Sequence, residues 1–154
     1  MDNFDYIALD LDKNLKPLSE RASHAEQENH FQVKITPTFP PLDGVKFKPN
    51  HFIYGSLTST TISIIARQDN GGDVQQFALV VPRAIKNGTH PLSEDLLAVV
   101  LAGGVFYRGQ NGSVTLEQVE ERQFVKASFE YQITYNGDIY KFKGELLIKA
   151  TAPL

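Results

Sequence analysis

The sequence predicts an all-β fold, an antiparallel, meander-rich β-sandwich or small β-barrel of about seven to nine strands. The dipeptide Asn-Gly occurs four times, and it favours two-residue hairpin turns because both residues tolerate a positive φ. The segments around these dipeptides alternate apolar and polar residues, as half-buried strands do. The 154 residues have the size of one domain, and neither a repeat nor a linker divides them.

The composition is that of an ordinary globular protein, with 42% hydrophobic and 21% charged residues. A net charge of -3 provides no broad basic face, so we expect binding neither to nucleic acid nor to an acidic membrane. The absence of cysteine excludes disulfides, a thiolate nucleophile and cysteine-ligated zinc. We expect a soluble protein, because the longest apolar run, 96–107, is too short to span a bilayer.

The first twenty residues do not predict a signal peptide, because they lack a basic start and a continuous apolar stretch. The sequence as written predicts a cytoplasmic location. An exported form stays open as an alternative, in which a leader was removed and replaced by Met1.

The last Asn-Gly pair, Asn136-Gly137, predicts the clearest hairpin. Apolar and polar residues alternate over 125–135 and again over 140–149. A two-residue turn pairs Tyr135 with Asp138, Ile133 with Tyr140, Tyr131 with Phe142, Glu130 with Lys143 and Phe129 with Gly144. A slip of one residue would exchange the two faces, so this agreement fixes the register. We expect the Phe129 ring to cover Gly144.

The other Asn-Gly pairs predict two further hairpins and one loop. The Asn70-Gly71 turn pairs Ile64 with Phe77 and Ile62 with Leu79, and the Asn111-Gly112 turn pairs Gly109 with Val114 and Tyr107 with Leu116. Each hairpin is apolar on one face and polar on the other, which is typical of a sheet with one solvated face. Asn87-Gly88 precedes Thr89-His90-Pro91 and is expected to close a longer loop.

The remaining elements divide the chain into a hairpin-rich body, 51–150, and an irregular part, 1–50, with a loop at 36–50 rich in proline and glycine. We expect strands at 4–11 and 30–35, and the segment 17–28, which starts at Pro17, allows one short helix. The segment 96–105 lacks alternation and predicts a strand buried on both faces, or alternatively a short helix starting near Pro91. Gly103-Gly104 within it predicts a bulge or a close backbone approach.

One motif carries acidic residues suited to catalysis. In Tyr6-Ile7-Ala8-Leu9-Asp10-Leu11-Asp12, an apolar segment ends in Asp-x-Asp. This resembles the first motif of the haloacid-dehalogenase-like phosphatases. The resemblance implies that Asp10 is a nucleophile and Asp12 a general acid, with a magnesium ion between them. It covers about ten residues, and Lys13-Asn14 stand where that family has Gly-Thr.

Other chemical motifs are incomplete. As a calcium loop, Asp10, Asp12 and Asn14 would take the first, third and fifth positions, but Leu15 and Arg21 replace the required glycine and glutamate. A weaker calcium site on the same three oxygens stays an alternative. The four histidines are widely separated, and the run Glu120-Glu121-Arg122 is typical of a solvated turn. We expect no cofactor.

Aromatic residues gather on one face of the C-terminal hairpin and are the best candidates for ligand binding. The candidates are Tyr131, Tyr135, Tyr140 and Phe142, with Tyr107 from a neighbouring strand. The alternative is that this face is the core, because the hairpin has no other apolar face. Pro37-Thr38-Phe39-Pro40 fits a Pro-x-x-Pro pattern, which we interpret as an ordered loop.

These observations favour a non-enzymatic binding or interaction module whose partner is a protein or a small apolar or sugar ligand. Three alternatives stay open. The first is a small-molecule or sugar carrier with an aromatic-lined barrel cavity. The second is a subunit of a larger assembly, in which an edge strand forms a homo-oligomer. The third is a metal-dependent hydrolase that uses Asp10 and Asp12.

Overall fold

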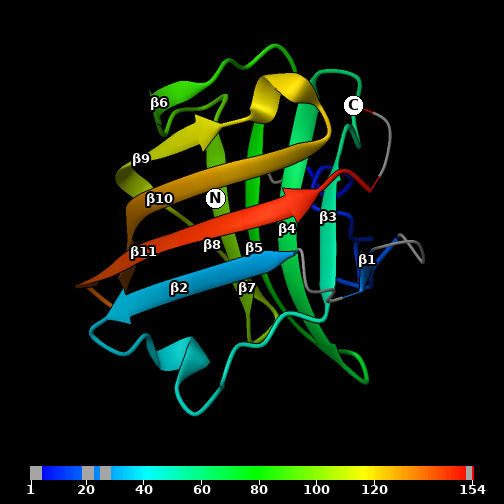
Figure 1. Ribbon diagram of the computed structural model, residues 1–154. Helices are drawn as coiled ribbons and strands as arrows, with labels where there is room; N and C mark the ends of the chain where they lie inside the picture. The colour runs from blue at the N-terminus through cyan, green and yellow to red at the C-terminus, as the bar shows by residue number, and fades with distance from the viewer. Residues whose placement is uncertain (1–4, 19–22, 25–28, 152–153) are drawn as a thin grey trace.

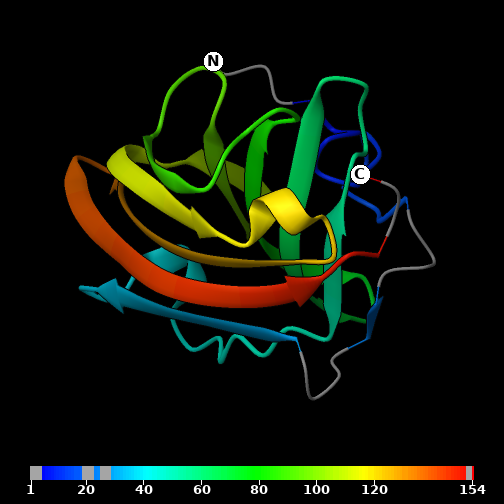
Figure 2. The ribbon, with the colours of Figure 1, turned by 45° about the horizontal axis from the view of Figure 1, so that its top comes forward.

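Two antiparallel sheets face each other in the computed structural model, which describes residues 5–18, 23–24, 29–151 and 154. The six-stranded sheet has the order β1 (Ser23–His24), β3 (His51–Gly55), β4 (Thr61–Asn70), β5 (Asp73–Pro82), β7 (Leu97–Ala102) and β8 (Val105–Arg108). The five-stranded sheet has the order β2 (His30–Thr36), β11 (Asp138–Lys149), β10 (Phe124–Tyr135), β9 (Gln110–Glu117) and β6 (Gly88–Pro91). The strands of the two sheets run across each other (Figures 1 and 2).

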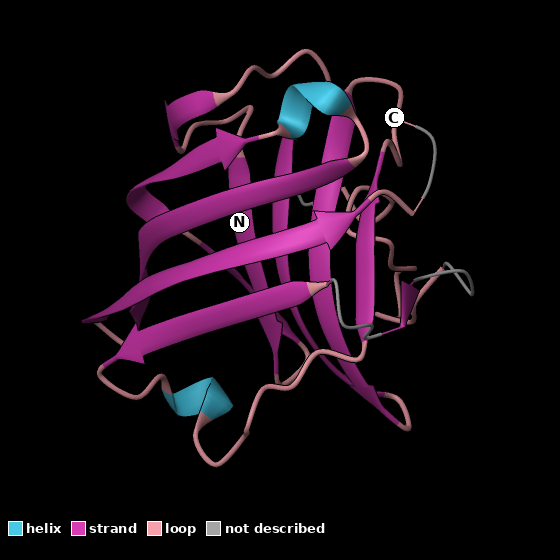
Figure 3. Cartoon of the chain, viewed as in Figure 1, coloured by secondary structure: helices cyan, strands magenta, loops and turns pink. Residues whose placement is uncertain are grey.

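In the part of the chain that the structure describes, the helical content is limited to two short 3-10 turns, η1 (Pro40–Leu42) and η2 (Val119–Glu121), drawn in cyan in Figure 3. Within the described ranges, neither of them has the length and apolar character needed to cross a membrane.

The predicted all-β sandwich is confirmed, and the two sheets do not close into a barrel. The described strands number eleven, more than the seven to nine expected. The difference comes from β1, β6 and β8, which have two, four and four residues. Strands this short do not show a recognisable alternation in the sequence.

The C-terminal hairpin is confirmed pair by pair. β10 and β11 pair Tyr135 with Asp138, Ile133 with Tyr140, Tyr131 with Phe142, Glu130 with Lys143 and Phe129 with Gly144. A Cβ atom added at Gly144 would lie 2.6 Å from Phe129 Cζ and 2.3 Å from the Gln32 carbonyl oxygen. Glycine is therefore required here, because the Phe129 ring and the β2 backbone occupy the space of a side chain.

The hairpin predicted at Asn70-Gly71 exists, but its predicted register is wrong by two residues. The turn is formed by Gly71 and Gly72, with φ of 65° and 99°. Ile64 consequently lies opposite Leu79, and Ile62 opposite Val81. The error preserves the inward face, because side chains alternate with a period of two. Two consecutive glycines adopt a positive φ without steric cost, so Gly71 and Gly72 form the turn and Asn70 stays in β4.

The hairpin predicted at Asn111-Gly112 is wrong. β8 pairs with β7, so Tyr107 lies opposite Val100, whereas β9 belongs to the other sheet and pairs Leu116 with Ala127. The turn in this region is Gly103-Gly104, with φ of 58° and 75°, so the bulge predicted there is also wrong. The strand predicted for 96–105 is confirmed over 97–102, as the buried β7, and ends at the Gly103-Gly104 turn, after which Val105 begins β8.

Asn111-Gly112 instead lies at an irregularity in the pairing of β9 with β10. Asn111 has a φ of 51°, and the register shifts between Glu130 and Gln132. A Cβ atom added at Gly112 would lie 2.0 Å from the Glu130 carbonyl oxygen and 2.5 Å from Tyr131 Cα. The dipeptide therefore serves a β-bulge, in which Asn tolerates the left-handed conformation and Gly permits close backbone approach.

The irregular N-terminal part differs from the expectations in one respect. The strand predicted for 4–11 is wrong over its described residues, because 5–10 form turns and Leu11 makes only an isolated bridge to Pro17. Of the helix allowed at 17–28, residues 19–22 and 25–28 lie outside the described residues, and 23–24 form β1. The strand at 30–35 and the loop at 36–50 are confirmed as β2 and the segment that carries η1.

Two hydrophobic cores hold the described chain together. The larger core lies between the sheets. The second lies on the outer face of the six-stranded sheet, where Ala8, Leu9 and Leu11 pack against side chains such as Ile65 and Val99. We call residues 5–17 the strap. β4, β5 and β7 are buried on both faces as a result, so the solvated outer face predicted for the hairpin of β4 and β5 is wrong.

We predict that Gly112→Ala destabilises the fold by about 1–3 kcal/mol, the usual cost of overpacking. The added methyl group would clash with the backbone of β10, which cannot rotate away as a side chain does. Urea unfolding measures the effect. The control is Ser113→Ala, one residue along β9, which adds no atoms. Equal urea midpoints for the two variants would contradict the close approach.

Candidate functional site

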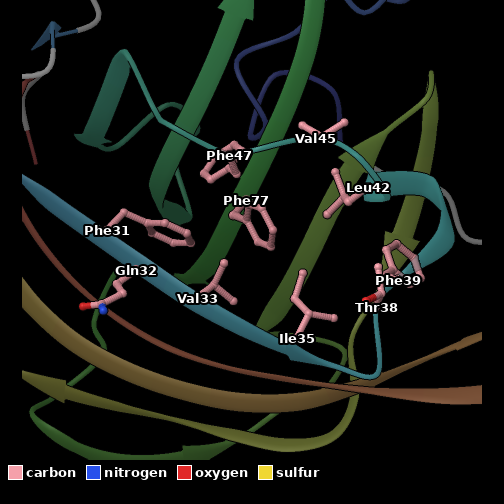
Figure 4. Close-up of a pocket in the computed structure, with 10 residues that line it drawn as sticks. All are labelled: Phe31, Gln32, Val33, Ile35, Thr38, Phe39, Leu42, Val45, Phe47 and Phe77. Carbon is pink, nitrogen blue, oxygen red and sulfur yellow. The ribbon is translucent and has the colours of Figure 1, made fainter.

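A groove opens beside β2, and we call it the β2 groove (Figure 4). Its volume is about 350 Å³. It is lined by Phe31, Gln32, Val33 and Ile35 from β2, by Thr38, Phe39, Leu42, Val45 and Phe47 from the following loop, and by Phe77 from β5. Most of the lining residues are apolar and several of their side chains are only half-buried, so the groove presents both apolar and polar surface to solvent.

The alternation of β2 provides one wall. Phe31, Val33 and Ile35 point into the groove, whereas Gln32 and Lys34 lie on the solvent face. Figure 4 shows Val33 and Ile35 pointing from β2 toward Phe77 and the loop. Because the period of the strand is two, the sequence of β2 places one apolar wall and one polar face on the same strand.

The loop that forms the opposite wall is firmly attached. The Asn50 side chain donates to the Asp69 carbonyl and accepts from the Asp69 amide, both at 3.0 Å. The Asn50 amide donates to the Arg67 carbonyl at 2.9 Å. Phe39 and Leu42 are buried at the other end of the loop. The groove is consequently preformed, as ligand sites usually are.

Aromatic rings close both ends of the β2 groove. At one end the Phe31 ring contacts Phe47, with ring centroids 5.7 Å apart, and both rings contact Phe77, at 5.2 and 4.8 Å. At the other end stands Phe39. Phe77 is only 3% exposed and belongs to the inter-sheet core. A side chain that entered the groove would therefore contact the core directly.

β2 is also the longest edge strand among the described residues. The sheet edges are β1, β8, β2 and β6, with two, four, seven and four residues. β6 ends in Pro91, which has no amide hydrogen to donate. The edge of β3 beyond β1 is taken by Thr151, whose amide donates to the Tyr54 carbonyl at 2.9 Å. Among the described strands, only β2 therefore offers a full length of backbone that no other described strand pairs with.

The aromatic candidates from the sequence come together, but Phe39 of the same chain fills the space between them. Phe39 is 1% exposed. Its ring centroid lies 5.1 Å from Tyr107, 5.6 Å from Tyr135, 5.3 Å from Tyr140 and 5.3 Å from Phe142. Tyr131 stacks on Phe142 at 5.3 Å. These side chains belong to or pack against the inter-sheet core.

The phenols in this cluster are poor candidates for acid-base chemistry. Burial raises the pKa of Tyr131 far above its ordinary value. Burial is also the larger cause that raises the pKa of Tyr107, and the neighbouring Tyr135 adds to it. Tyr107 and Tyr131 therefore stay protonated at neutral pH.

The two candidate aspartates take part in local structure. Asp10 is 4% exposed, and its Oδ2 accepts a charged hydrogen bond from Arg67 Nη1 at 3.2 Å. Arg67 Nη2 donates to the Asp10 carbonyl at 3.2 Å, and Arg67 Nε donates to Gln76 at 2.8 Å. Asp12 Oδ1 accepts from the amides of Asn14 and Lys16, at 2.8 and 3.0 Å.

The buried ion pair joins the strap to the six-stranded sheet. Arg67 is 1% exposed, and burial lowers its pKa while the nearby Asp10 carboxylate opposes that shift. Gln76 Nε2 donates to the Leu9 carbonyl at 2.9 Å, and Ser63 Oγ donates to the Ala8 carbonyl. The polar side chains of β4 and β5 thus satisfy the carbonyl groups of the strap that lie over them.

The described histidines and acidic residues do not gather into a group of three that could hold a metal ion. His30 lies 3.9 Å from Glu145 on the exposed face of the five-stranded sheet. His90 Nε2 lies 2.8 Å from the Lys86 carbonyl oxygen. Glu120 accepts from the Asn87 amide and lies 3.8 Å from Lys86, so it holds the loop before β6.

Sequence reasoning missed the β2 groove. Its walls come from a strand, the following loop and β5, which are far apart along the chain. The alternation of Phe31, Val33 and Ile35 was visible in the sequence. The loop was not interpretable, because Leu42, Val45 and Phe47 follow neither a helical nor a strand period.

We predict that Arg67→Met destabilises the protein by about 3–5 kcal/mol, because it removes the cation that faces the buried Asp10 carboxylate. The double variant Asp10→Asn with Arg67→Met should lose less stability than Arg67→Met alone, because it also removes the buried carboxylate. Asn tolerates the positive φ of position 10, which is 58°. Urea unfolding measures the stability of the single variant, of the double variant and of Arg83→Met, which is the exposed control. A loss for Arg67→Met no larger than that of the control would contradict this role of the ion pair.

No family model, curated protein or solved structure matches this chain in the three comparisons.

Proposed function

We propose that this protein is a non-enzymatic binding module that binds an extended peptide segment of a partner protein along β2. The observation that carries the proposal is the position of the apolar β2 groove directly beside the longest edge strand of the described sheets. Strand addition to a sheet edge is a common mode of peptide recognition, in which backbone hydrogen bonds give affinity and pockets for alternate side chains give specificity.

The geometry of β2 suits this mode of binding. Of the described strands, β11 alone pairs with β2, so every second residue of β2 directs its N–H and C=O groups away from the sheet. A segment paired there would alternate between the solvent face and the side of the groove. Its inward side chains would meet Val33, Ile35 and Phe77.

A small apolar ligand in the same groove is the second candidate. The observation in its favour is the volume of about 350 Å³, which falls within the range of small-molecule sites. Such a ligand would occupy the groove alone and would make no hydrogen bonds to the backbone of β2. The carrier with an aromatic-lined cavity has less support, because Phe39 fills the space between those aromatic residues.

The test uses a neutral, acetylated and amidated peptide, Ser-Val-Ser-Val-Ser-Val-Ser, added to the isotope-labelled protein. We expect amide chemical-shift changes in β2 and in the loop 38–47. Val33→Arg should weaken binding about tenfold, because it removes the burial of about one valine side chain. Thr134→Arg, on the solvent face of β10, introduces the same charge away from the groove and should leave binding within about twofold.

The proposal fails if the shift changes lie away from β2 and its groove, or if the two arginine variants bind equally well. Shift changes that reach the groove residues and leave the β2 amides unmoved would favour the small apolar ligand instead. Circular dichroism of both variants checks that their folds are intact.

A further inference from the structure

We infer that the segment bound along β2 carries an acidic residue between two apolar residues, with the acidic side chain beside Lys34. This inference rests on the proposed function and names the chemistry of the partner. The apolar residues of the segment would enter the β2 groove, and the acidic residue would lie on the solvent face of the five-stranded sheet.

Lys34 stands in an unfavourable electrostatic position. It lies directly opposite Lys143 in the pairing of β2 with β11, and Lys141 and Glu145 lie diagonal to it on the same face. Like charges directly opposite each other destabilise a sheet. The described ion pairs of this face join His30 with Glu145 and Lys126 with Glu117, and none of those found in the described residues includes Lys34.

The excess positive charge lies at the free edge of the sheet. Lys143 has an acidic neighbour on its other side, because Glu130 lies opposite it in the pairing of β10 with β11. No described strand lies on the other side of Lys34. A carboxylate on an added strand would occupy the position next to Lys34 that Glu130 occupies next to Lys143. It would offset the repulsion between the two lysines.

The face has room for such a group. A shallow hollow of about 330 Å³ is lined by Gln32, Val33, Lys34, Ser128, Lys143, Gly144 and Glu145. It extends from the edge strand over β11, and both lysines belong to its walls. A strand added to β2 would lie about 4.8 Å from it, within reach of the Lys34 ammonium group.

The spacing of the motif follows from the strand period. Lys34 is on the solvent face, and its neighbours Val33 and Ile35 are on the groove face. Residues of an added strand opposite these three would therefore point into the groove, out to Lys34 and into the groove again. The order apolar, acidic, apolar is the one that satisfies both faces.

A second copy of this chain is a poorer occupant of the same edge. Antiparallel pairing of β2 with itself, centred anywhere from Val33 to Ile35, brings the two Lys34 side chains opposite or diagonal to each other. Each Lys34 would also lie beside the Lys143 of its own chain, which adds to the repulsion between the two copies. Lysine on an edge strand is a known means by which proteins avoid such self-association.

The test compares three acetylated and amidated peptides, Thr-Val-Xaa-Val-Thr-Val-Thr, in which Xaa is Glu, Gln or Lys. For the unmodified protein at low salt, we expect the Glu peptide to bind about threefold tighter than the Gln peptide and about tenfold tighter than the Lys peptide. Lys34→Glu should invert the order of the Glu and Lys peptides. At about 1 M salt the preference should largely disappear, because the Debye length falls to about 3 Å.

Lys126→Glu is the matched control, because it makes the same change of charge on the same face but on β10. It should leave the preference for the Glu peptide unchanged. If Lys34→Glu and Lys126→Glu changed the preference for the Glu peptide equally, the inference would be overturned, because an equal change would indicate a general effect of net charge.

The failure of this inference is distinguishable from the failure of the proposed function. Equal binding of the three peptides, together with a loss of binding in Val33→Arg, would overturn the acidic preference and leave the proposed function in place. Failure of all three peptides and of the neutral peptide to bind would overturn both. Dimerisation through β2, detected by sedimentation velocity and abolished by Val33→Arg, would replace the acidic partner by a second copy.

Discussion

The packing of Phe39 between the two sheets is the contact on which the site depends. Its ring meets aromatic residues from β8, β10 and β11, and it comes from the loop that leads from β2 to β3. Four edge-on or tilted ring contacts of this kind contribute about 0.5–1.5 kcal/mol each beyond the area they bury. The loop is thereby fixed at one end by Phe39 and at the other by Asn50. Between these anchors it forms the wall of the β2 groove.

The two sheets differ in what covers their outer faces, and this difference decides where another molecule has access. The strap covers the outer face of the six-stranded sheet and binds it through a second core and the pair of Asp10 with Arg67. The outer face of the five-stranded sheet is polar, with exposed side chains such as Lys141 and Glu130. Beside β2, the half-buried side chains of Phe31, Val33 and Ile35 stay within reach of another molecule.

The sequence predicts the fold well where alternation and turn chemistry agree. In β10 and β11 a long alternation of apolar and polar residues flanks one Asn-Gly pair. This pattern correctly predicts which side chains point inward, the register of the two strands and the position of the Phe129 ring over Gly144. At Asn70 the inward face is correct but the register is not, because Asn-Gly-Gly offers two turns that differ by one residue at each strand end. At Asn111 the prediction fails, because Asn and Gly serve a bulge as readily as a turn.

The candidate site is predicted less well, for a physical reason. The aromatic residues of the C-terminal hairpin are correctly identified as neighbours, but the sequence does not show that Phe39 fills the space between them. Loop residues such as Phe39 and Phe47 have no period that fixes their direction, so their contacts depend on the whole fold. Asp10 is a related case, because its partner Arg67 lies 57 positions along the chain.

The edges of the two sheets give the binding hypothesis its remaining support. A sandwich with four edges must protect each of them from unwanted pairing, and three are protected by short length, by Pro91 or by Thr151. β2 is protected differently, by the charge of Lys34 on a strand that is otherwise long, regular and apolar on one side. Charge is a selective form of protection, because it repels a lysine-bearing strand and attracts an acidic one. The Lys34 charge therefore disfavours pairing of β2 with a second copy of β2 and favours pairing with a strand that carries an acidic residue.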